Sequence, residues 1–265
     1  MFKKRWINSL PNRLFPYLFI HPGRIRNSLR EADSISTNEH SRRVRAMFSD
    51  IAGRYDLLNH LLSANVDKRW RQIMRKRISD VLLDKSAVVL DAACGTGDLT
   101  LELSRGAAAR VLGIDFCRPM LEVAAQKSSK IPWIEGDAMK LPFADEAFDA
   151  VTIAFGLRNL VDCREGLGEL HRILKPNGIL AVLEFSSPII PGFKTIFQFY
   201  FSRILPRIGG IVSGNRGAYE YLPDSVSRFP DQRSLAEMFR ETGFGGVEYS
   251  NLTGGIAAIH SGRRI

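Results

Sequence analysis

The first regular pattern in the chain is a stripe of apolar residues at helical spacing. The stripe begins at residue 44, and its members are Val44, Met47, Phe48, Ile51, Tyr55, Leu58 and Leu62. A second helix is predicted from Asp67 to about Leu83, with Asp67 as its N-cap. Residues 41–84 are therefore expected to form a helical cap that precedes the rest of the fold.

From residue 87 onward, short apolar runs alternate with helical patterns. The runs predicted as strands are 87–91, 110–115, 131–135, 148–155 and 179–185. The helices predicted between them are 98–104, 119–126 and 164–174, and the last one ends at a Pro-Asn-Gly turn. Strands that alternate with helices in this way form a parallel sheet that is covered on both faces.

The alternation stops after the fifth strand. Residues 187–230 are rich in proline, glycine and aromatic residues, and we expect an insertion on the substrate side of the sheet, with a helix at 192–205. A helix at 231–242 and an antiparallel pair of strands at 247–252 and 255–260 complete the pattern. The sequence thus predicts a Rossmann-like α/β fold: a mostly parallel central sheet with an antiparallel final strand, helices on both faces, and the N-terminal helical cap.

The positive charge of the chain is concentrated at its N-terminus. The 265 residues have a formal net charge of +9, from 37 Lys and Arg and 28 Asp and Glu. Residues 1–45 contain ten basic and three acidic residues, so the remaining 220 residues carry only +2. A nearly neutral body does not favour a nucleic-acid-binding surface. Residues 1–40 are expected to be a basic, poorly ordered extension, and a transit peptide or a membrane-surface anchor is the alternative.

Cysteine and histidine positions argue against disulfides and against a metal. Cys94, Cys117 and Cys163 are too few and too scattered for a disulfide framework or a zinc site. The five histidines show no metal-ligand spacing; they are His21, His40, His60, His171 and His260. No apolar stretch approaches the ~18–20 residues that span a bilayer. The sequence therefore predicts a protein of a reducing cytosol that is not integral to a membrane and requires no metal.

Candidate cofactor-binding residues follow the first three predicted strands. A turn with Gly95 and Gly97 follows the first strand, where glycine lets the backbone approach a ligand. Asp115 ends the second strand, and a carboxylate there is placed to accept both hydroxyls of a ribose. Asp137 and Ala138 follow the third strand, where the aspartate can meet the amino group of an adenine.

The same arrangement would also suit a dinucleotide, but two positions favour S-adenosylmethionine. The dinucleotide pattern G-x-G-x-x-G would need glycine at position 100, where Thr100 stands. Asp98 at a helix N-terminus would repel a pyrophosphate, whereas the cationic groups of S-adenosylmethionine match Asp91 and Asp98. A purely structural interpretation stays open, since Thr96 and Asp98 can simply cap a helix and an aspartate is common in turns.

Four segments carry a more specific pattern. They are Leu90-Asp91-x-x-x-Gly95-Thr96-Gly97-Asp98-Leu99, Leu141-Pro142-Phe143, Phe155-Gly156-Leu157-Arg158-Asn159 and Tyr219-x-Tyr221-Leu222. From about residue 44 to the C-terminus, the chain with these segments resembles the C-methyltransferases of menaquinone and ubiquinone biosynthesis. The resemblance implies the class I methyltransferase fold, a single domain over residues 41–265, and S-adenosylmethionine as the cofactor.

The resemblance also implies individual cofactor contacts, at Thr96, Asp115 and the Asp137-Ala138 pair. The sequence departs from its relatives at two positions. Ala154 stands where related proteins often have serine, so the contact of that hydroxyl with the cofactor is not carried over. Asp67 stands where many relatives have histidine.

The reaction that the resemblance implies is methylation of a ring carbon in a reduced, polyprenylated quinone precursor. The ring must be electron-rich, so the acceptor is expected to be the hydroquinone, best as its phenolate. Arg158 and Asn159, at the end of the fourth strand, are the first candidates for holding the phenolate oxygen, followed by Tyr219, Tyr221 and Glu184. A structural salt bridge is the alternative for Arg158, and core packing is the alternative for Tyr221.

The acceptor is expected to be demethylmenaquinol, and a benzoquinol precursor of ubiquinone or another small molecule is the alternative. Amine-modifying methyltransferases of nucleic acids usually have an Asn/Asp-Pro-Pro-aromatic segment after the fourth strand, where residues 154–158 stand instead. The isoprenoid tail would enter past the first helix and the phenylalanine-rich residues 193–205. We therefore expect a cytoplasmic protein, peripheral at the inner membrane surface and in transient contact with it, whose oligomeric state the sequence leaves open.

Overall fold

The structure is a computed structural model that describes residues 39–63, 65–190, 195, 199, 203 and 216–265. At its centre is a seven-stranded sheet with the strand order β3-β2-β1-β4-β5-β7-β6. The strands are β1 Val88–Ala92, β2 Arg110–Asp115, β3 Trp133–Glu135, β4 Phe148–Ala154, β5 Leu174–Phe185, β6 Phe244–Leu252 and β7 Ala257–Arg264. The first five pair in parallel, and β7 lies antiparallel between β5 and β6. The predicted mostly parallel sheet with an antiparallel final strand is thus confirmed.

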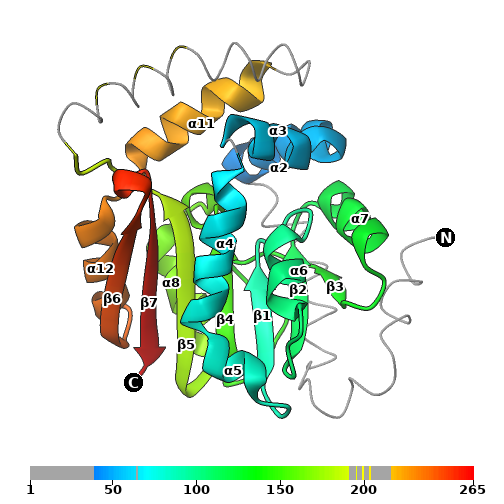
Figure 1. Cartoon of the computed structure of the whole chain (residues 1–265), viewed down its shortest axis with the longest axis vertical. Helices are drawn as coiled ribbons and strands as arrows, with labels where there is room; N and C mark the ends of the chain where they lie inside the picture. Colours follow the sequence, from blue (N-terminus) through cyan, green and yellow to red (C-terminus); the bar gives the residue numbers. More distant parts are fainter. Residues whose placement is uncertain (1–38, 64, 191–194, 196–198, 200–202, 204–215) are drawn as a thin grey trace.

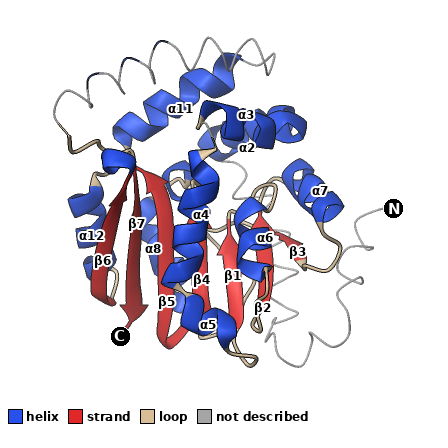
Figure 2. Cartoon of the chain, in the orientation of Figure 1, coloured by secondary structure: helices blue, strands red, loops and turns tan. Residues whose placement is uncertain are grey.

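Helices cover both faces of the sheet, as predicted (Figure 2). On one face lie α4 Val66–Arg77, α5 Ser79–Leu83 and α6 Asp98–Ser104. On the other face lie α8 Cys163–Ile173 and α12 Gln232–Glu241. The central strands alternate their side chains between these two apolar layers, which is why their sequences are almost continuously apolar.

Two helices start where an aspartate side chain accepts the first backbone N–H groups. Asp162 accepts from two N–H groups at the start of α8, and Asp231 accepts from Ser234 N–H at the start of α12. The helix predicted at 231–242 therefore begins one residue later, because Asp231 is its N-cap.

The helical cap lies over the carboxyl ends of the central strands, beside α11 Arg216–Arg228 (Figure 1). This cap consists of α2 Glu39–Ile51 and α3 Tyr55–Leu62, joined by the 3-10 turn Ala52–Arg54. The single apolar stripe read from the sequence is thus interrupted, at a place where Gly53 is a weak helix former. Its buried residues pack on α7 Arg118–Lys127, which fixes the cap above β2. The rest of the predicted cap region 41–84 forms α4 and α5, whose apolar side chains pack on a face of the sheet instead.

The prediction that Asp67 caps the second helix is wrong. That helix begins at Val66 after Asn65, which has a left-handed backbone (φ 63) and no side-chain capping hydrogen bond. Asp67 lies inside the first turn, and its carboxylate is taken by side chains instead of the helix N–H groups. The helix also ends at Arg77 and is followed by the separate α5, so the predicted span 67–83 is two helices.

Two predicted segments lie wholly or mostly outside the described residues. The basic extension 1–40 has only its last two residues described, and the predicted helix 192–205 has only positions 195, 199 and 203. The C-terminal part of the expected insertion forms α11. Within the described part of the chain, no helix is both long and apolar enough to span a membrane.

Candidate active site

A cavity lies at the carboxyl ends of β1, β2, β3 and β4, below the helical cap. In an open α/β sheet, ligands bind at this edge, beside the point where the strand order reverses, here between β1 and β4. Six of the seven residues predicted to bind the cofactor line the cavity: Asp91, Gly95, Thr96, Asp115, Asp137 and Ala138. The cap contributes Ser41, Phe48 and Tyr55 to the lining.

The two glycines of the turn after β1 have different roles. Gly95 has a left-handed backbone (φ +55), and a Cβ added to it would meet no atom within 4 Å, so the backbone is open on this side. Gly97 is also left-handed (φ +82), but its added Cβ would lie 2.4 Å from the Trp133 ring. Gly97 does not line the cavity. Gly95 therefore fits the predicted close approach to a ligand, whereas Gly97 is needed for packing of the turn against β3.

Asp115 is held by the backbone of two loops. Its Oδ2 accepts a hydrogen bond from Gly95 N–H at 2.8 Å, and its Oδ1 accepts one from Cys117 N–H at 2.8 Å. Burial raises the pKa of Asp115 to about 6, although both hydrogen bonds lower it. A carboxylate has about four acceptor positions, so each oxygen keeps capacity for one further donor. This geometry fits the two hydroxyls of a ribose.

Asp91 is satisfied by the protein itself. The hydroxyls of Thr100 and Thr152 donate to its two oxygens at 2.6 and 2.8 Å. Burial raises the pKa of Asp91 to about 7, against the opposing effect of these hydrogen bonds. Thr100, which stands where a dinucleotide fold would have glycine, thus serves to hold the carboxylate at the base of the cavity.

Two other carboxylates of the cavity also have partners in the protein. Asp137 accepts a hydrogen bond from Met139 N–H at 2.9 Å, so it is both a turn residue and a cavity residue. Asp98 Oδ1 lies 2.7 Å from Lys127 Nζ. If Asp98 binds the ammonium group of a ligand, as predicted, that group has to compete with Lys127 for the carboxylate.

The cap is tied directly to the glycine-rich turn. The Thr96 hydroxyl donates to Asp56 Oδ1 at 2.5 Å, and Asp56 Oδ2 lies 2.6 Å from Lys127 Nζ. Asp56 belongs to α3, so these contacts join the cap, the turn after β1 and α7. This link could not be predicted from the sequence, because the partners are 40 or more positions apart.

The three predicted catalytic residues lie together beyond the end of β4. Tyr221 donates its hydroxyl to Asn159 Oδ1 at 3.1 Å, and the Asn159 amide donates to the Phe155 carbonyl at 3.2 Å. Arg158 donates to the same carbonyl at 2.5 Å. Of the three, only Asn159 lines the cavity. Tyr219, a further candidate, has a side chain outside the described part of the structure.

Arg158 forms the buried salt bridge that the sequence left open. Its Nη1 is 2.8 Å from Glu184 Oε1, and the two side chains are 6% and 1% exposed. Burial raises the pKa of Glu184, although the charge of Arg158 lowers it. The guanidinium also lies over the Phe185 ring, while its buried Nε has no hydrogen-bond partner in the described structure. Arg158 is therefore held in position through Nη1, and its buried Nε–H is not used by any described residue.

A model of the ubiE/COQ5 methyltransferase family matches residues 36–264, which is most of the chain. The chain belongs to this methyltransferase family. It is 50% identical over 224 residues to the demethylmenaquinone methyltransferase of Thermus thermophilus, a match that covers 82% of this chain and 100% of the relative. It is 44% identical over 235 residues to the ubiquinone/menaquinone biosynthesis C-methyltransferase UbiE of Citrifermentans bemidjiense, covering 86% and 98% of the two chains.

The fold of this ubiE/COQ5 methyltransferase agrees with solved structures. A SAM-dependent methyltransferase from Thermotoga maritima matches it with a TM-score of 0.58, covering 83% of this chain and 99% of that one. At 18% identity this likeness shows the fold alone. Family and fold together make the protein an S-adenosylmethionine-dependent C-methyltransferase of class I, as the sequence segments implied.

Two non-glycine residues that line the methyltransferase cavity have left-handed backbone conformations. Ala93 (φ 49) follows β1 and Phe155 (φ 56) follows β4, and both line the cavity. A Cβ added to Gly156 would lie 2.6 Å from Ala93 Cβ, so glycine is required for the two loops to approach. Strained non-glycine residues of this kind cluster at functional sites. Sequence patterns do not show backbone angles, so this feature was missed.

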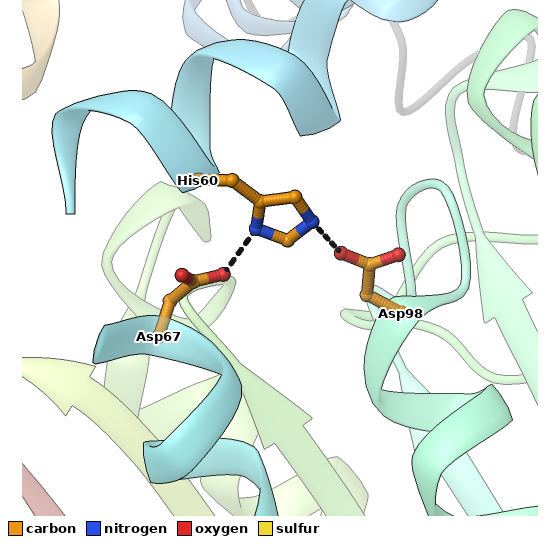
Figure 3. Close-up of side chains that lie close together, drawn as sticks. All are labelled: His60, Asp67 and Asp98. Carbon is orange, nitrogen blue, oxygen red and sulfur yellow. Dashed lines mark hydrogen bonds and ion pairs between the residues drawn. The ribbon is translucent and has the colours of Figure 1, made fainter. Parts of the chain in front are cut away.

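The fold also brings together His60, Asp67 and Asp98, from α3, α4 and α6 (Figure 3). One potential metal-ligand atom from each lies within 4.8 Å of the others. Spacing along the sequence had not suggested this group. However, Arg71 pairs with both carboxylates and Lys127 pairs with Asp98, so both carboxylates already have cationic partners within the protein. We interpret the group as part of an ion-pair network.

Proposed function

We propose that this protein transfers the methyl group of S-adenosylmethionine to a ring carbon of a reduced, polyprenylated quinone precursor, and that the acceptor is demethylmenaquinol. The observation that carries the proposal is the single cavity in which the polar residues for the cofactor meet Asn159 and an apolar wall. The polar residues come from the ends of β1, β2 and β3, and Asn159 comes from the end of β4. The relative from Thermus thermophilus is named a demethylmenaquinone methyltransferase. This name supports demethylmenaquinol, a naphthoquinol, as the acceptor over a benzoquinol.

The proposed cofactor contacts follow the geometry of the strand ends. Asp115 accepts the two ribose hydroxyls, and Asp137 with Ala138 borders the adenine. Gly95 and Thr96 border the methionine part, where the open side of Gly95 leaves room. S-adenosylmethionine supplies a methyl group on a sulfonium, which is electrophilic enough that the reaction needs no metal. The chain's main task is to hold the methyl and the ring carbon in line, which can contribute ~7–11 kcal/mol.

We propose that Asn159 binds the phenolic oxygen of the acceptor. Its amide is oriented on both sides, by the Tyr221 hydroxyl and by the Phe155 carbonyl. Arg158 donates to the same Phe155 carbonyl as Asn159 and adds positive charge that favours the phenolate over the phenol. The Arg158–Glu184 pair keeps this charge in place, because a buried guanidinium without a partner would be costly.

The apolar part of the acceptor would enter between the cap and the loop after β4. Phe48, Phe116, Leu160 and Val161 line this part of the cavity. Val161 is 46% exposed. An apolar lining suits an isoprenoid tail, and a quinol with such a tail is dissolved in a membrane. We therefore propose a peripheral contact with the membrane that holds the quinol, and no nucleic-acid partner.

The test is methyl transfer from labelled S-adenosylmethionine to reduced demethylmenaquinone. Oxidised demethylmenaquinone and a demethylated benzoquinol precursor of ubiquinone serve as parallel substrates. Product from the reduced naphthoquinone alone supports the proposal, and faster transfer to the benzoquinol would instead assign the protein to ubiquinone synthesis. If the protein binds the cofactor tightly but methylates none of these quinols, the quinone proposal is wrong.

A further inference from the structure

The methionine part of S-adenosylmethionine carries a carboxylate as well as cationic groups, and the cavity has few partners for it. Four carboxylates line the cavity: Asp91, Asp98, Asp115 and Asp137. Among the described lining residues, Arg71 is the one with a basic side chain. The guanidinium of Arg71 is therefore the one cationic partner that the described lining offers to a carboxylate group of a ligand.

We propose that Arg71 binds the α-carboxylate of the methionine part, and that Asp67, with His60 and Ser63 behind it, positions the guanidinium for this contact. The inference rests on the proposed function only in taking S-adenosylmethionine as the ligand of this cavity. It does not depend on which quinol is methylated.

The geometry of Arg71 leaves donors for a second carboxylate. Its side chain is 9% exposed, and Nη1 lies 2.6 Å from Asp67 Oδ2. Its Nη2 lies 3.5 Å from Asp98 Oδ2, which is too long for a close charge-assisted hydrogen bond. A guanidinium has five N–H donors in a planar fork and commonly binds a carboxylate through two of them. One short contact to Asp67 therefore does not exhaust its capacity.

Asp67 is built to hold the guanidinium still. Its carboxylate accepts hydrogen bonds from the Ser63 hydroxyl at 2.6 Å and from Arg71 at 2.6 Å. The same carboxylate lies 2.8 Å from His60 Nδ1 (Figure 3). Burial raises the pKa of Asp67, but the hydrogen bond from Ser63 and the charge of Arg71 outweigh this, so its pKa lies below the usual range. The carboxylate is thus ionised and fixed from two helices, α3 and α4.

The helix that carries Arg71 is itself anchored to the rest of the site. Trp70 donates its indole N–H to the Thr253 hydroxyl at 3.0 Å, and its ring lies 6.1 Å from the Phe155 ring, measured between centroids. Phe155 lines the same cavity. Because both the helix and the guanidinium are fixed before the ligand arrives, little ordering is needed on binding. A preorganised cation of this kind is expected to discriminate strongly for the carboxylate.

The experiment compares two ligands on the full-length protein by calorimetry. S-adenosylhomocysteine carries the α-carboxylate, and its decarboxylated analogue lacks only that group. Wild-type protein is expected to bind S-adenosylhomocysteine about 10- to 100-fold more tightly than the analogue, which is the range of a charge-assisted pair. In Arg71→Met this ratio is expected to fall below about threefold, with the affinity for the analogue unchanged.

The matched control is Arg69→Met, an exposed arginine on the same helix, which is expected to keep the wild-type ratio. Arg71→Met removes the arginine that pairs with the buried Asp67 carboxylate. The double variant Asp67→Asn/Arg71→Met therefore provides a neutral pair that tests the same ratio. Arg71→Lys keeps the positive charge but loses the planar guanidinium that can bind a carboxylate through two N–H groups. The ratio of the two ligand affinities is therefore expected to lie between those of wild type and Arg71→Met.

Each outcome has a distinct meaning. If wild-type protein does not discriminate between the ligands, or if Arg71→Met weakens both equally, the carboxylate contact is wrong and Arg71 has only a structural role. If wild-type protein binds neither ligand, S-adenosylmethionine is not the cofactor, and the proposed function itself fails.

Discussion

Replacing Asp115 by asparagine tests how the cavity recognises a ribose. The native carboxylate accepts from Gly95 N–H through one oxygen and from Cys117 N–H through the other. Asparagine keeps the shape, but it has a single acceptor oxygen and turns an NH₂ group toward one of the two N–H groups. At least one charge-assisted hydrogen bond to the ribose is also lost, at about 1.5–3 kcal/mol. We therefore expect S-adenosylhomocysteine to bind about 10- to 150-fold more weakly.

The measurement is calorimetric titration of Asp115→Asn with S-adenosylhomocysteine at pH 8, where the carboxylate of the wild-type protein is ionised. Asp84→Asn, at an exposed turn remote from the cavity, is the matched control and is expected to bind like wild type. Wild-type affinity is expected to fall as the pH drops through about 6, where Asp115 takes up a proton and loses acceptor capacity. Affinity of Asp115→Asn within twofold of wild type would refute the ribose assignment.

Three further predictions concern stability and the reaction. Gly97→Ala adds a Cβ at φ +82 and 2.4 Å from the Trp133 ring, and we expect a loss of about 1–3 kcal/mol in the free energy of unfolding, read from urea denaturation. Asp91, with its pKa raised to about 7, keeps its proton in the folded protein between pH 4 and 7, where the unfolded chain loses it. Stability is therefore expected to fall by up to about 4 kcal/mol as the pH rises through this window, and Asp91→Asn should reduce that slope in thermal melts; a steeper slope would contradict the assignment. Tyr221→Phe removes the hydrogen bond to Asn159, and methyl transfer is expected to slow about 2- to 10-fold at unchanged cofactor affinity; unchanged kcat would rule out this orienting role.

The parts of the fold predicted correctly depend on local patterns. The helix at 98–104 and the strand at 110–115 were predicted with the bounds that the structure has, because both have clear apolar periodicity and turn residues at their ends. The position of Asp115 at a strand end followed from the same periodicity. Asp67 was misassigned because an aspartate at the start of a helix can cap its N–H groups or bind side chains. The i,i+4 spacing to Arg71 is visible in the sequence but does not decide between these roles, and only the fold supplies His60.

The parts of the site that were missed depend on contacts between distant segments. Arg71 has three arginine neighbours on its helix, Arg69, Arg75 and Arg77, and nothing in their spacing distinguishes the one that lines the cavity. A salt bridge of Arg158 was an open alternative, but the sequence did not identify Glu184 as its partner, because the two residues lie 26 positions apart. Such pairings are set by the order of strands in the sheet.

That strand order has a consequence for synthesis of the protein on the ribosome. β7 lies between β5 and β6, so one edge of β5 has no neighbour until residues 257–264 have been made. They follow the end of β5 by about 70 residues, a delay of roughly 4–14 s at ~5–20 residues per second. Throughout that interval a nascent chain presents the open backbone edge of β5, with the apolar side chains of Val182 and Leu183 beside it. The strand that covers this edge of β5 is therefore made after β6, although β6 lies farther out in the finished sheet.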